Sequence, residues 1–333
     1  MMDIYAGAFL TISAAISPHV QHGFLYSLKD PSHQTATKRL MDSDNPLYYR
    51  GWALQERVLS RRVLIFSKNG MFWECQEYDS MSYVQLQCFP CIPRYCSWRL
   101  KRGCPYEDWV TIVEDYTRRM LILEQDNLPA LSGLAMLYHH LTKHDYLAGM
   151  WKQSLVFELL WRSPPSLSAD WDLPSNHTAP SWSWASANGA IDHTIVETVT
   201  DTTKVLSTQI ELKDPQVPFG EVMGGSIVLC GPLVPESEVD LQVIDVWKDK
   251  RTPLSKTQQS QGKIWYMLLR IDFKGQGHGL ILEGGQGANQ SYFIRIGAFG
   301  LMARRTRSYI WVPPSADVFA PFTNCENSTI TII

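Results

Sequence analysis

The 333-residue chain lacks the features that mark several common classes of protein. Its 30 basic residues face 33 acidic ones, and no basic run is longer than a pair. Nucleic acids and anionic membranes attract clustered Lys and Arg, so neither partner is indicated. The chain also has no uninterrupted apolar run of membrane-spanning length, and Asp3 stands where a secretory signal would carry basic residues. We therefore expect no nucleic-acid partner, no membrane span and no signal peptide.

Cysteine is sparse and odd in number, at seven residues. A chain of this size does not need disulfides in place of a core, so a reduced compartment, the cytoplasm, is favoured. The one metal-like cluster consists of Cys88, Cys91, Cys96 and Cys104. Only the first two have the Cys-x-x-Cys spacing, and no His lies near the others. We expect free thiols in a loop and no metal site, with a structural zinc site as the alternative.

Signatures of common enzymes are also missing. The sequence contains no nucleophile elbow, P-loop, His-Glu-x-x-His or kinase motif. Gly275, Gly277 and Gly279 lie between two predicted strands and open no helix, so they offer no phosphate site. Motifs therefore leave open whether the chain is an enzyme, and they indicate no cofactor.

What the chain does contain is material for a packed core. It is 45% hydrophobic and 19% charged, which is typical of a folded protein long enough for two domains. Its 12 Trp residues bury large areas in cores or interfaces, and we expect most of them in the core.

The chain is organised around residues 50–60, with the sequence Arg-Gly-Trp-Ala-Leu-Gln-Glu-Arg-Val-Leu-Ser. Trp52, Gln55, Glu56 and Leu59 are three or four residues apart, so a helix would place them on one face. A β-branched and apolar run at 62–66, turn residues at 67–70 and a second apolar run at 71–75 predict two strands joined by a turn.

These stretches resemble the fungal heterokaryon incompatibility (HET) domain family, which has a similar Arg-Gly-Trp-x-Leu-Gln-Glu-Arg stretch and a similar Phe-Trp-Glu-Cys strand end. Residues 109–119, 126–135 and 180–186 also resemble family patterns, the last one Pro-Ser-Trp-Ser-Trp-Ala-Ser. The resemblance marks as motif or binding residues Arg50, Gly51, Trp52, Gln55, Arg57, Trp73, Trp182 and Trp184.

The family's N-terminal half is not found in this sequence. Motifs similar to Leu-Ser-Tyr-x-Trp-Gly and Trp-Ile-Asp-x-x-Cys-Ile-Asn-Gln are absent, so the resemblance begins in the middle of the domain. A mispredicted start codon, a decayed gene and a naturally short protein are the three explanations. Residues 9–14 form an apolar strand of the kind buried on both faces of a parallel sheet. Without neighbours such a strand exposes an apolar edge, so we expect the chain to be poorly soluble unless something covers it.

The expected fold is α+β, in three regions. Residues 1–75 resemble the C-terminal part of an α/β (TIR-like) HET domain, 76–188 form a helical region ending in the Trp-Ser-Trp strand, and 189–333 are rich in strands. The apolar spacing predicts a helix from Glu107 to about Met120 and a second one capped by Asp126 with Pro129 in its first turn. Residues 155–161 suggest a third helix, and alternation places Trp182 and Trp184 on one face of a strand.

The resemblance implies a protein of fungal non-self recognition, that is, vegetative incompatibility and programmed cell death, acting through protein partners. Glu56 is the candidate catalytic residue of a first alternative, a TIR-like enzyme that cleaves NAD as substrate. For Glu56 we expect the structural role, an ion pair with a neighbour such as Arg57 or Arg50. In a second alternative, a truncated HET-like protein serves as a secondary-metabolism enzyme, with a small-molecule ligand at the Trp-rich face.

Overall fold

The computed structural model spans residues 1–333 and divides into two compact units, Met1–His144 and Asp145–Ile333. It describes residues 2–18, 21, 23–24, 45–67, 70–76, 105–164, 179–187, 189–193, 199–241, 244–249, 263–286, 291–301, 304–305, 311–312 and 316–333. The division between His144 and Asp145 falls inside the stretch 76–188 that the sequence predicts as one helical region.

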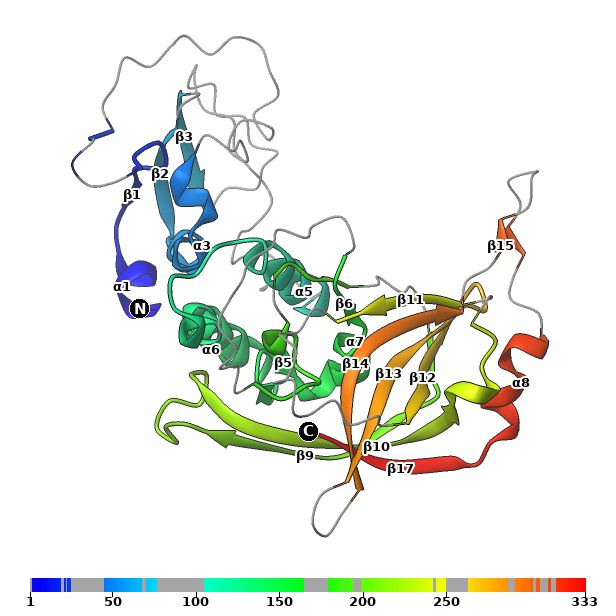
Figure 1. Ribbon diagram of the computed structural model, residues 1–333. Coiled ribbons are helices and arrows are strands. Elements are labelled where there is room, and N and C mark those ends of the chain that lie inside the picture. The colour runs from blue at the N-terminus through cyan, green and yellow to red at the C-terminus, as the bar shows by residue number, and fades with distance from the viewer. Residues whose placement is uncertain are drawn as a thin grey trace. The chain divides into compact units, whose positions relative to one another are not determined.

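The first unit contains a three-stranded sheet, drawn in blue in Figure 1. Its strands are β1 (Thr11–Ser13), β2 (Arg62–Ser67) and β3 (Gly70–Cys75), in the order β1-β2-β3. β2 and β3 form the predicted antiparallel hairpin, and β1 pairs with β2 in parallel. Because side chains alternate along a strand, Val63 and Ile65 share one face, where they are buried with Ala15.

Short helices make up the rest of this unit. They are α1 (Met2–Gly7), α3 (Gly51–Leu59), α5 (Pro105–Tyr116) and α6 (Ser132–Thr142), with the 3-10 helices η2 (Pro46–Tyr49), η3 (Glu124–Asp126) and η4 (Pro129–Leu131). The predicted apolar stripes of α5 and α6 meet in the core, where the rings of Trp109 and Tyr138 lie 5.5 Å apart. α3 lies between β1 and β2 in the chain, so the three elements form a β-α-β unit.

Two helix boundaries predicted from the sequence are wrong for tertiary reasons. α5 ends at Tyr116 instead of near Met120, because Met120 forms backbone hydrogen bonds with Tyr49 and Gly51 and is drawn out of the helix. Asp126 does not cap the second helix, since it lies in η3 and its carboxylate accepts a hydrogen bond from Trp52. Residues 129–131 form a separate 3-10 turn, and α6 begins only at Ser132.

The predicted burial of residues 9–14 is also wrong. Only Thr11–Ser13 form a strand, and Phe9 and Ile12 are 82% and 57% exposed. Among the described residues β1 pairs with β2 alone, so no second neighbour covers its other side.

The second unit begins with short elements that carry much of its aromatic core. They are β4 (Tyr146–Leu147), β5 (Met150–Trp151), η5 (Lys152–Ser154), α7 (Leu155–Glu158), β6 (Trp161–Arg162), η7 (Trp184–Ser186) and β7 (Asp192–His193). The predicted third helix is therefore shorter than residues 155–161, because Trp161 leaves it to pair with His193 in a two-stranded sheet.

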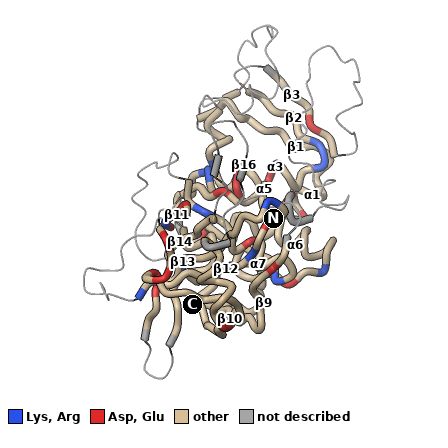
Figure 2. The backbone as a smooth tube through the Cα atoms, turned by 90° about the vertical axis from the view of Figure 1, so that its right-hand side faces the viewer, with Lys and Arg blue, Asp and Glu red and all other residues tan. Residues whose placement is uncertain are grey.

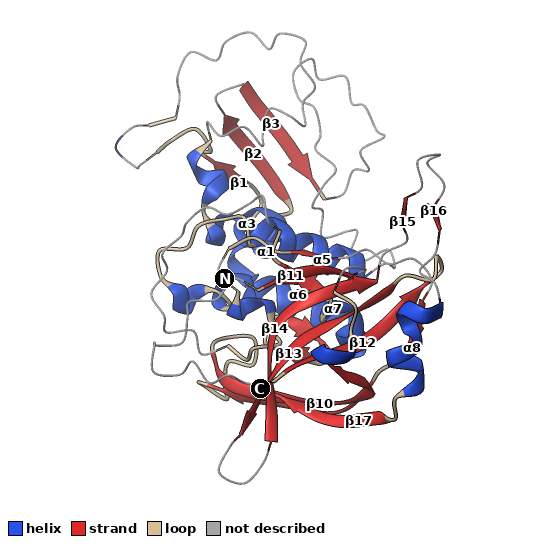
Figure 3. Ribbon diagram, turned by 45° about the vertical axis from the view of Figure 1, so that its right-hand side comes forward, coloured by secondary structure: helices blue, strands red, loops and turns tan. Residues whose placement is uncertain are grey.

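An eight-stranded sheet follows in this unit and confirms the predicted strand-rich C-terminal region (Figure 3). Its strands are β8 (Val199–Asp201), β9 (Lys204–Leu212), β10 (Val222–Pro235), β11 (Ile244–Lys248), β12 (Ile264–Asp272), β13 (Gly277–Gln286), β14 (Ser291–Leu301) and β17 (Asn327–Ile332). The order is β8-β12-β13-β14-β17-β10-β9, with β11 beside β14. β10 also pairs with β12, so five of the strands close on themselves.

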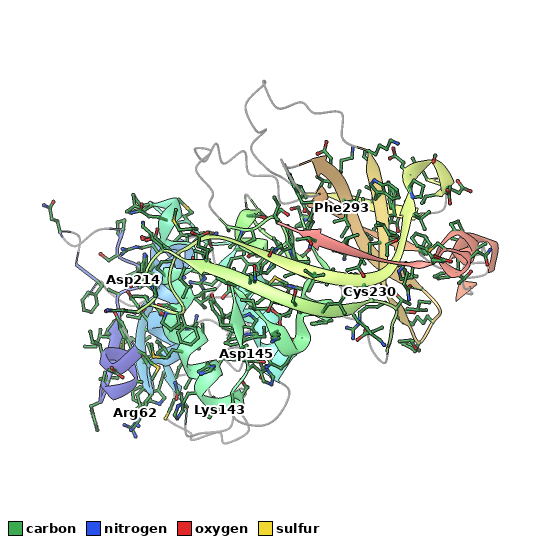
Figure 4. The ribbon with its side chains drawn as sticks, turned by 90° about the horizontal axis from the view of Figure 1, so that it is seen from below. Arg62, Lys143, Asp145, Asp214, Cys230 and Phe293 are labelled. Carbon is green, nitrogen blue, oxygen red and sulfur yellow. The ribbon has the colours of Figure 1, made fainter. Side chains whose placement is uncertain are left out.

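Strand β10 closes the sheet, because it pairs in turn with β9, β17 and β12. β10 bends after its pairing with β9, and Figure 4 shows Cys230 at this point of β10, where it lies opposite Thr329 of β17. The enclosed core includes Leu268, Ile281, Phe299 and Phe322. The remaining described elements are the 3-10 helix η8 (Glu236–Glu238), the short pair β15 (Arg304–Arg305) and β16 (Trp311–Val312), and α8 (Ala316–Asn324).

Together the helices and the strand-rich second unit give an α+β protein. No helix among the described residues is long and apolar enough to cross a membrane. Lys, Arg, Asp and Glu are interspersed along the described parts of the backbone, without a long run of one sign (Figure 2).

Candidate functional site

Helix α3 holds most of the motif residues, and its start is set by close packing. Arg50 is extended, and the N–H of Gly51 donates to the carbonyl of Met120 at 2.8 Å. A Cβ at position 51 would lie 2.5 Å from Leu121 Cδ2, so only glycine fits without a shift of that side chain. The glycine of the motif is therefore favoured by its close packing against the segment that follows α5.

Two further motif side chains connect α3 to the segment 126–133. Trp52 Nε1 donates to Asp126 Oδ2 at 3.0 Å. Gln55, which is fully buried, accepts a 2.7 Å hydrogen bond on Oε1 from the backbone N–H of Gly133. These contacts satisfy polar groups that would be costly to bury alone, so they fix the position of α3 against the start of α6.

Arg57 connects α3 to the hairpin. Its Nε donates to Glu74 Oε2 at 2.8 Å and its Nη2 pairs with the other carboxylate oxygen, which gives a two-pronged ion pair. Just after β3, Gln76 Nε2 donates to the carbonyls of Val58 and Ser60 at the end of α3. Glu74 is the glutamate of the Phe-Trp-Glu-Cys stretch, so two motif-like stretches bind each other here.

Glu56 is half-buried on the same helix. It accepts a hydrogen bond from the Tyr5 hydroxyl and lies near Arg50. Burial raises the pKa of the Glu56 carboxyl, and the hydrogen bond from Tyr5 and the charge of Arg50 only partly oppose this. The expected pairing with Arg57 is wrong, since Arg57 binds Glu74, whereas Arg50 does contribute.

A second polar group lies beside α3. Tyr48 donates to Asp115 Oδ1 at 3.1 Å, and Arg119 Nη2 pairs with Asp115 Oδ2 at 2.9 Å. The Arg119 guanidinium also stacks over the Tyr48 ring at 4.5 Å. Burial and the Asp115 charge raise the pKa of Tyr48, so the phenol stays protonated at neutral pH. These contacts hold the end of α5 in place, and the charges of Asp115 and Arg119 compensate each other within the group.

The two Trp residues of the Trp-Ser-Trp stretch do not belong to this site. Both lie in the second unit, in a turn and the 3-10 helix η7 instead of the predicted strand. Trp182 is 0% and Trp184 2% exposed, so their indoles present no open ligand surface. Trp184 Nε1 donates to the carbonyl of Gly149, and Trp161 Nε1 donates to the carbonyl of Trp182. They are core residues.

The structure thus brings together Arg50, Gly51, Trp52, Gln55, Glu56 and Arg57 on α3 and its N-cap, while Trp73 is half-buried on the hairpin strand β3. Sequence reasoning missed the partners Tyr5, Glu74, Asp126 and Gly133. Glu74 and Gly133 could have been found, because each lies in a stretch that the sequence analysis singled out. Tyr5 carries no such signal.

Chemically, the site offers one half-exposed carboxyl with a raised pKa, beside a phenol and a guanidinium. No group of three or more His, Cys, Asp or Glu side chains placed to hold a metal occurs in the part of the chain that the structure describes. Cys88, Cys91, Cys96 and Cys104 lie outside the described residues.

Replacing Gly133 with Ala tests the contact between Gln55 and α6. The new Cβ would lie 2.6 Å from Gln55 Oε1 and 3.0 Å from Leu59 Cδ1. We expect a loss of about 1–3 kcal/mol in the free energy of unfolding, measured by urea denaturation, because overpacking forces neighbours to shift. Gly7→Ala is the matched control, since nothing lies within 4 Å of its Cβ position. Equal stability of the two variants would contradict the tight contact.

No protein family, no curated protein and no solved structure matches this chain.

Proposed function

We propose that the chain is a protein of the fungal heterokaryon incompatibility type, which acts in non-self recognition and programmed cell death through contacts with other proteins. One observation carries this proposal. The side chains of Trp52, Gln55 and Arg57 are engaged with Asp126, Gly133 and Glu74, which all lie in other family-like stretches. Hydrogen bonds and an ion pair therefore join stretches that are far apart in the sequence within one unit, as expected if these stretches belong to one domain.

The same proposal includes the fold of the first unit. The parallel pairing of β1 with β2 across α3 is the arrangement expected for part of an α/β, TIR-like domain. Because Trp52, Gln55 and Arg57 of α3 are bound within the unit, their role in this proposal is to build the unit, and partner proteins are bound elsewhere on its surface.

A second candidate function, NAD cleavage, is favoured by Glu56 alone. It is the one acidic side chain of α3, it is half-exposed, and its pKa is raised by burial, as is frequent for catalytic carboxyls. In this reaction water would add to the ribose C1′ carbon as nicotinamide leaves, and Glu56 would stabilise the positive charge that develops on the ribose. The small-molecule alternative at the Trp-rich face loses its support, because both indoles are buried.

Glu56→Gln separates the two functions. We expect inducible production of the chain in a filamentous fungus to reduce the viable cell count, and Glu56→Gln to kill as efficiently as the parent. Since Glu56 is half-exposed, the change should alter the free energy of unfolding by no more than about 1 kcal/mol. Asp3→Asn, an exposed carboxyl on α1, is the matched control.

Two outcomes would contradict the proposal. Stable production of the chain without any loss of viability would argue against cell killing. A drop on the order of a hundredfold in nicotinamide release from NAD by Glu56→Gln, with the melting temperature unchanged, would identify Glu56 as a catalytic residue and favour the enzyme.

A further inference from the structure

Strand β1 leaves an apolar surface at the end of the first unit's sheet. Phe9 is 82% exposed, Ile4 68% and Ile12 57%. Among the described residues β1 pairs only with β2, so its other edge offers unpaired backbone N–H and C=O groups. Burying apolar surface is favourable, by about 25 cal/mol of transfer free energy for every Å² removed from water. The surface is thus suited to a partner that supplies both a strand and apolar side chains.

The orientation of β1 shows which of its two faces is exposed. Thr11 Oγ1 and Ser60 Oγ share a 2.7 Å hydrogen bond, which turns the Thr11 face toward the end of α3. Because side chains alternate along a strand, Ile12 points to the opposite face, and this is the exposed one. The Arg62 guanidinium lies 5.2 Å from the centre of the Phe9 ring, so a positive charge borders this surface.

The sequence of β1 and its neighbours lacks the residues that usually block a strand edge. Residues 9–17, Phe-Leu-Thr-Ile-Ser-Ala-Ala-Ile-Ser, contain no charged residue and no proline. Natural edge strands are commonly blocked by Lys, by Pro or by an inward-pointing charge, because an open edge templates pairing with another chain. An unprotected edge that also exposes Phe and Ile side chains is expected to be paired.

We propose that β1 pairs with β1 of a second copy of this chain, antiparallel and centred on Ile12. In this register Ile12 lies opposite Ile12 of the second copy, and Thr11 lies opposite Ser13 of the second copy. The sequence Thr-Ile-Ser is polar-apolar-polar about its centre, so it complements itself under the two-fold axis. Apolar and Thr–Ser pairs directly opposite each other are favourable, and no like charges meet.

The result is a six-stranded sheet, β3-β2-β1 continued by β1-β2-β3 of the second copy. The surface is small, because it consists of one three-residue strand and a few apolar side chains. Stable interfaces bury about 800 Å² on each partner, so we expect a dimer that dissociates on dilution. This inference does not rest on the proposed function, since it uses only the exposure and the pairing of β1.

Analytical ultracentrifugation of the full chain over a range of concentrations tests the pairing. We expect a monomer–dimer equilibrium for the parent and a monomer at all concentrations for Ile12→Lys, because a charge at the centre would face its own copy. Ile122→Lys is the matched control: Ile122 is 93% exposed in the same unit but lies outside β1, so its variant should dimerise like the parent. A parent that is monomeric throughout, or that forms only open-ended aggregates, overturns the proposal.

Oxidative cross-linking tests the register and does not depend on the stability of the Lys variant. Opposite residues in an antiparallel pair have Cα atoms about 4.5–5.5 Å apart, which suits a disulfide. Ile12→Cys should therefore give a covalent dimer on a non-reducing gel, above the background of the parent's own cysteines. Ser13→Cys should not, because its own counterpart is a diagonal neighbour about 7–8 Å away. Equal cross-linking of the two variants, or none for Ile12→Cys, overturns the register.

Discussion

Replacing Arg295 with Met is expected to lower the free energy of unfolding of the second unit by about 3–5 kcal/mol. The guanidinium is fully buried, and Nε donates to Asp249 Oδ2 at 2.9 Å. Nη1 donates to the carbonyl of Leu159 at 2.6 Å, and Nη2 donates to the carbonyl of Trp161 at 2.5 Å. The guanidinium also stacks 3.5 Å from the centre of the Trp161 ring. The variant leaves the buried carboxylate of Asp249 without its countercharge and two carbonyls without donors.

Urea denaturation of the full chain, followed by Trp fluorescence, measures this loss. Lys213→Met is the matched control, because Lys213 forms an exposed ion pair with Glu221 that should contribute at most about 1 kcal/mol. The double variant Arg295→Met, Asp249→Leu should recover much of the stability, since it removes both buried charges together. If Arg295→Met is no less stable than Lys213→Met, Arg295 does not hold the unit together.

Raising the pH from 4.5 to 8 is expected to destabilise the second unit through Glu158. This carboxyl is buried on α7 and accepts hydrogen bonds from Ser154 Oγ and from the N–H of Trp151, at 3.2 Å. Burial raises its pKa to about 8, against the opposing effect of these hydrogen bonds. The folded state therefore binds a proton that the unfolded chain releases near pH 4.5, and stability falls as the pH rises between these values.

The expected loss over this range is on the order of 3–5 kcal/mol, because each pKa unit corresponds to about 1.4 kcal/mol. Glu158→Gln keeps the shape and an acceptor for the Trp151 N–H but cannot ionise. We expect the variant to be more stable than the parent at pH 8 and to lose most of the slope between pH 5 and 8 in urea denaturation. Glu211→Gln, at an exposed position of β9, is the control and should keep the slope. An unchanged slope in Glu158→Gln would show that the carboxyl is already ionised.

Both predictions concern residues at the end of α7 or just after it, so much of the second unit's stability is expected to depend on this part of the chain. Leu159 and Trp161 offer their carbonyls to Arg295, and the backbone N–H of Arg295 donates to Ser181 Oγ at 3.1 Å. A segment remote in sequence thus depends on one side chain of β14.

Local pattern was enough for the parts of the fold that depend on neighbours in sequence. The apolar spacing from Glu107 to about Met120 and after Asp126 indicated α5 and α6, and the runs at 62–66 and 71–75 indicated the hairpin. The central part of each element forms where the sequence predicts it, because its hydrogen bonds are made within a few residues and one apolar face repeats at the right period.

The tertiary structure alone decided the partners and the ends of those elements. Arg57 binds Glu74 instead of Glu56, since β3 brings a carboxylate to the end of α3. Met120 leaves α5 to pair with residues 49 and 51, and the two Trp of the Trp-Ser-Trp stretch are buried in a turn instead of presented on a strand. Such outcomes depend on which groups meet across long sequence separations, where the cost of burying an unpaired polar group selects one arrangement. The neighbours of β1 also depend on contacts between distant parts of the sequence. The sequence therefore indicated that β1 is apolar, but only the structure showed that it is exposed.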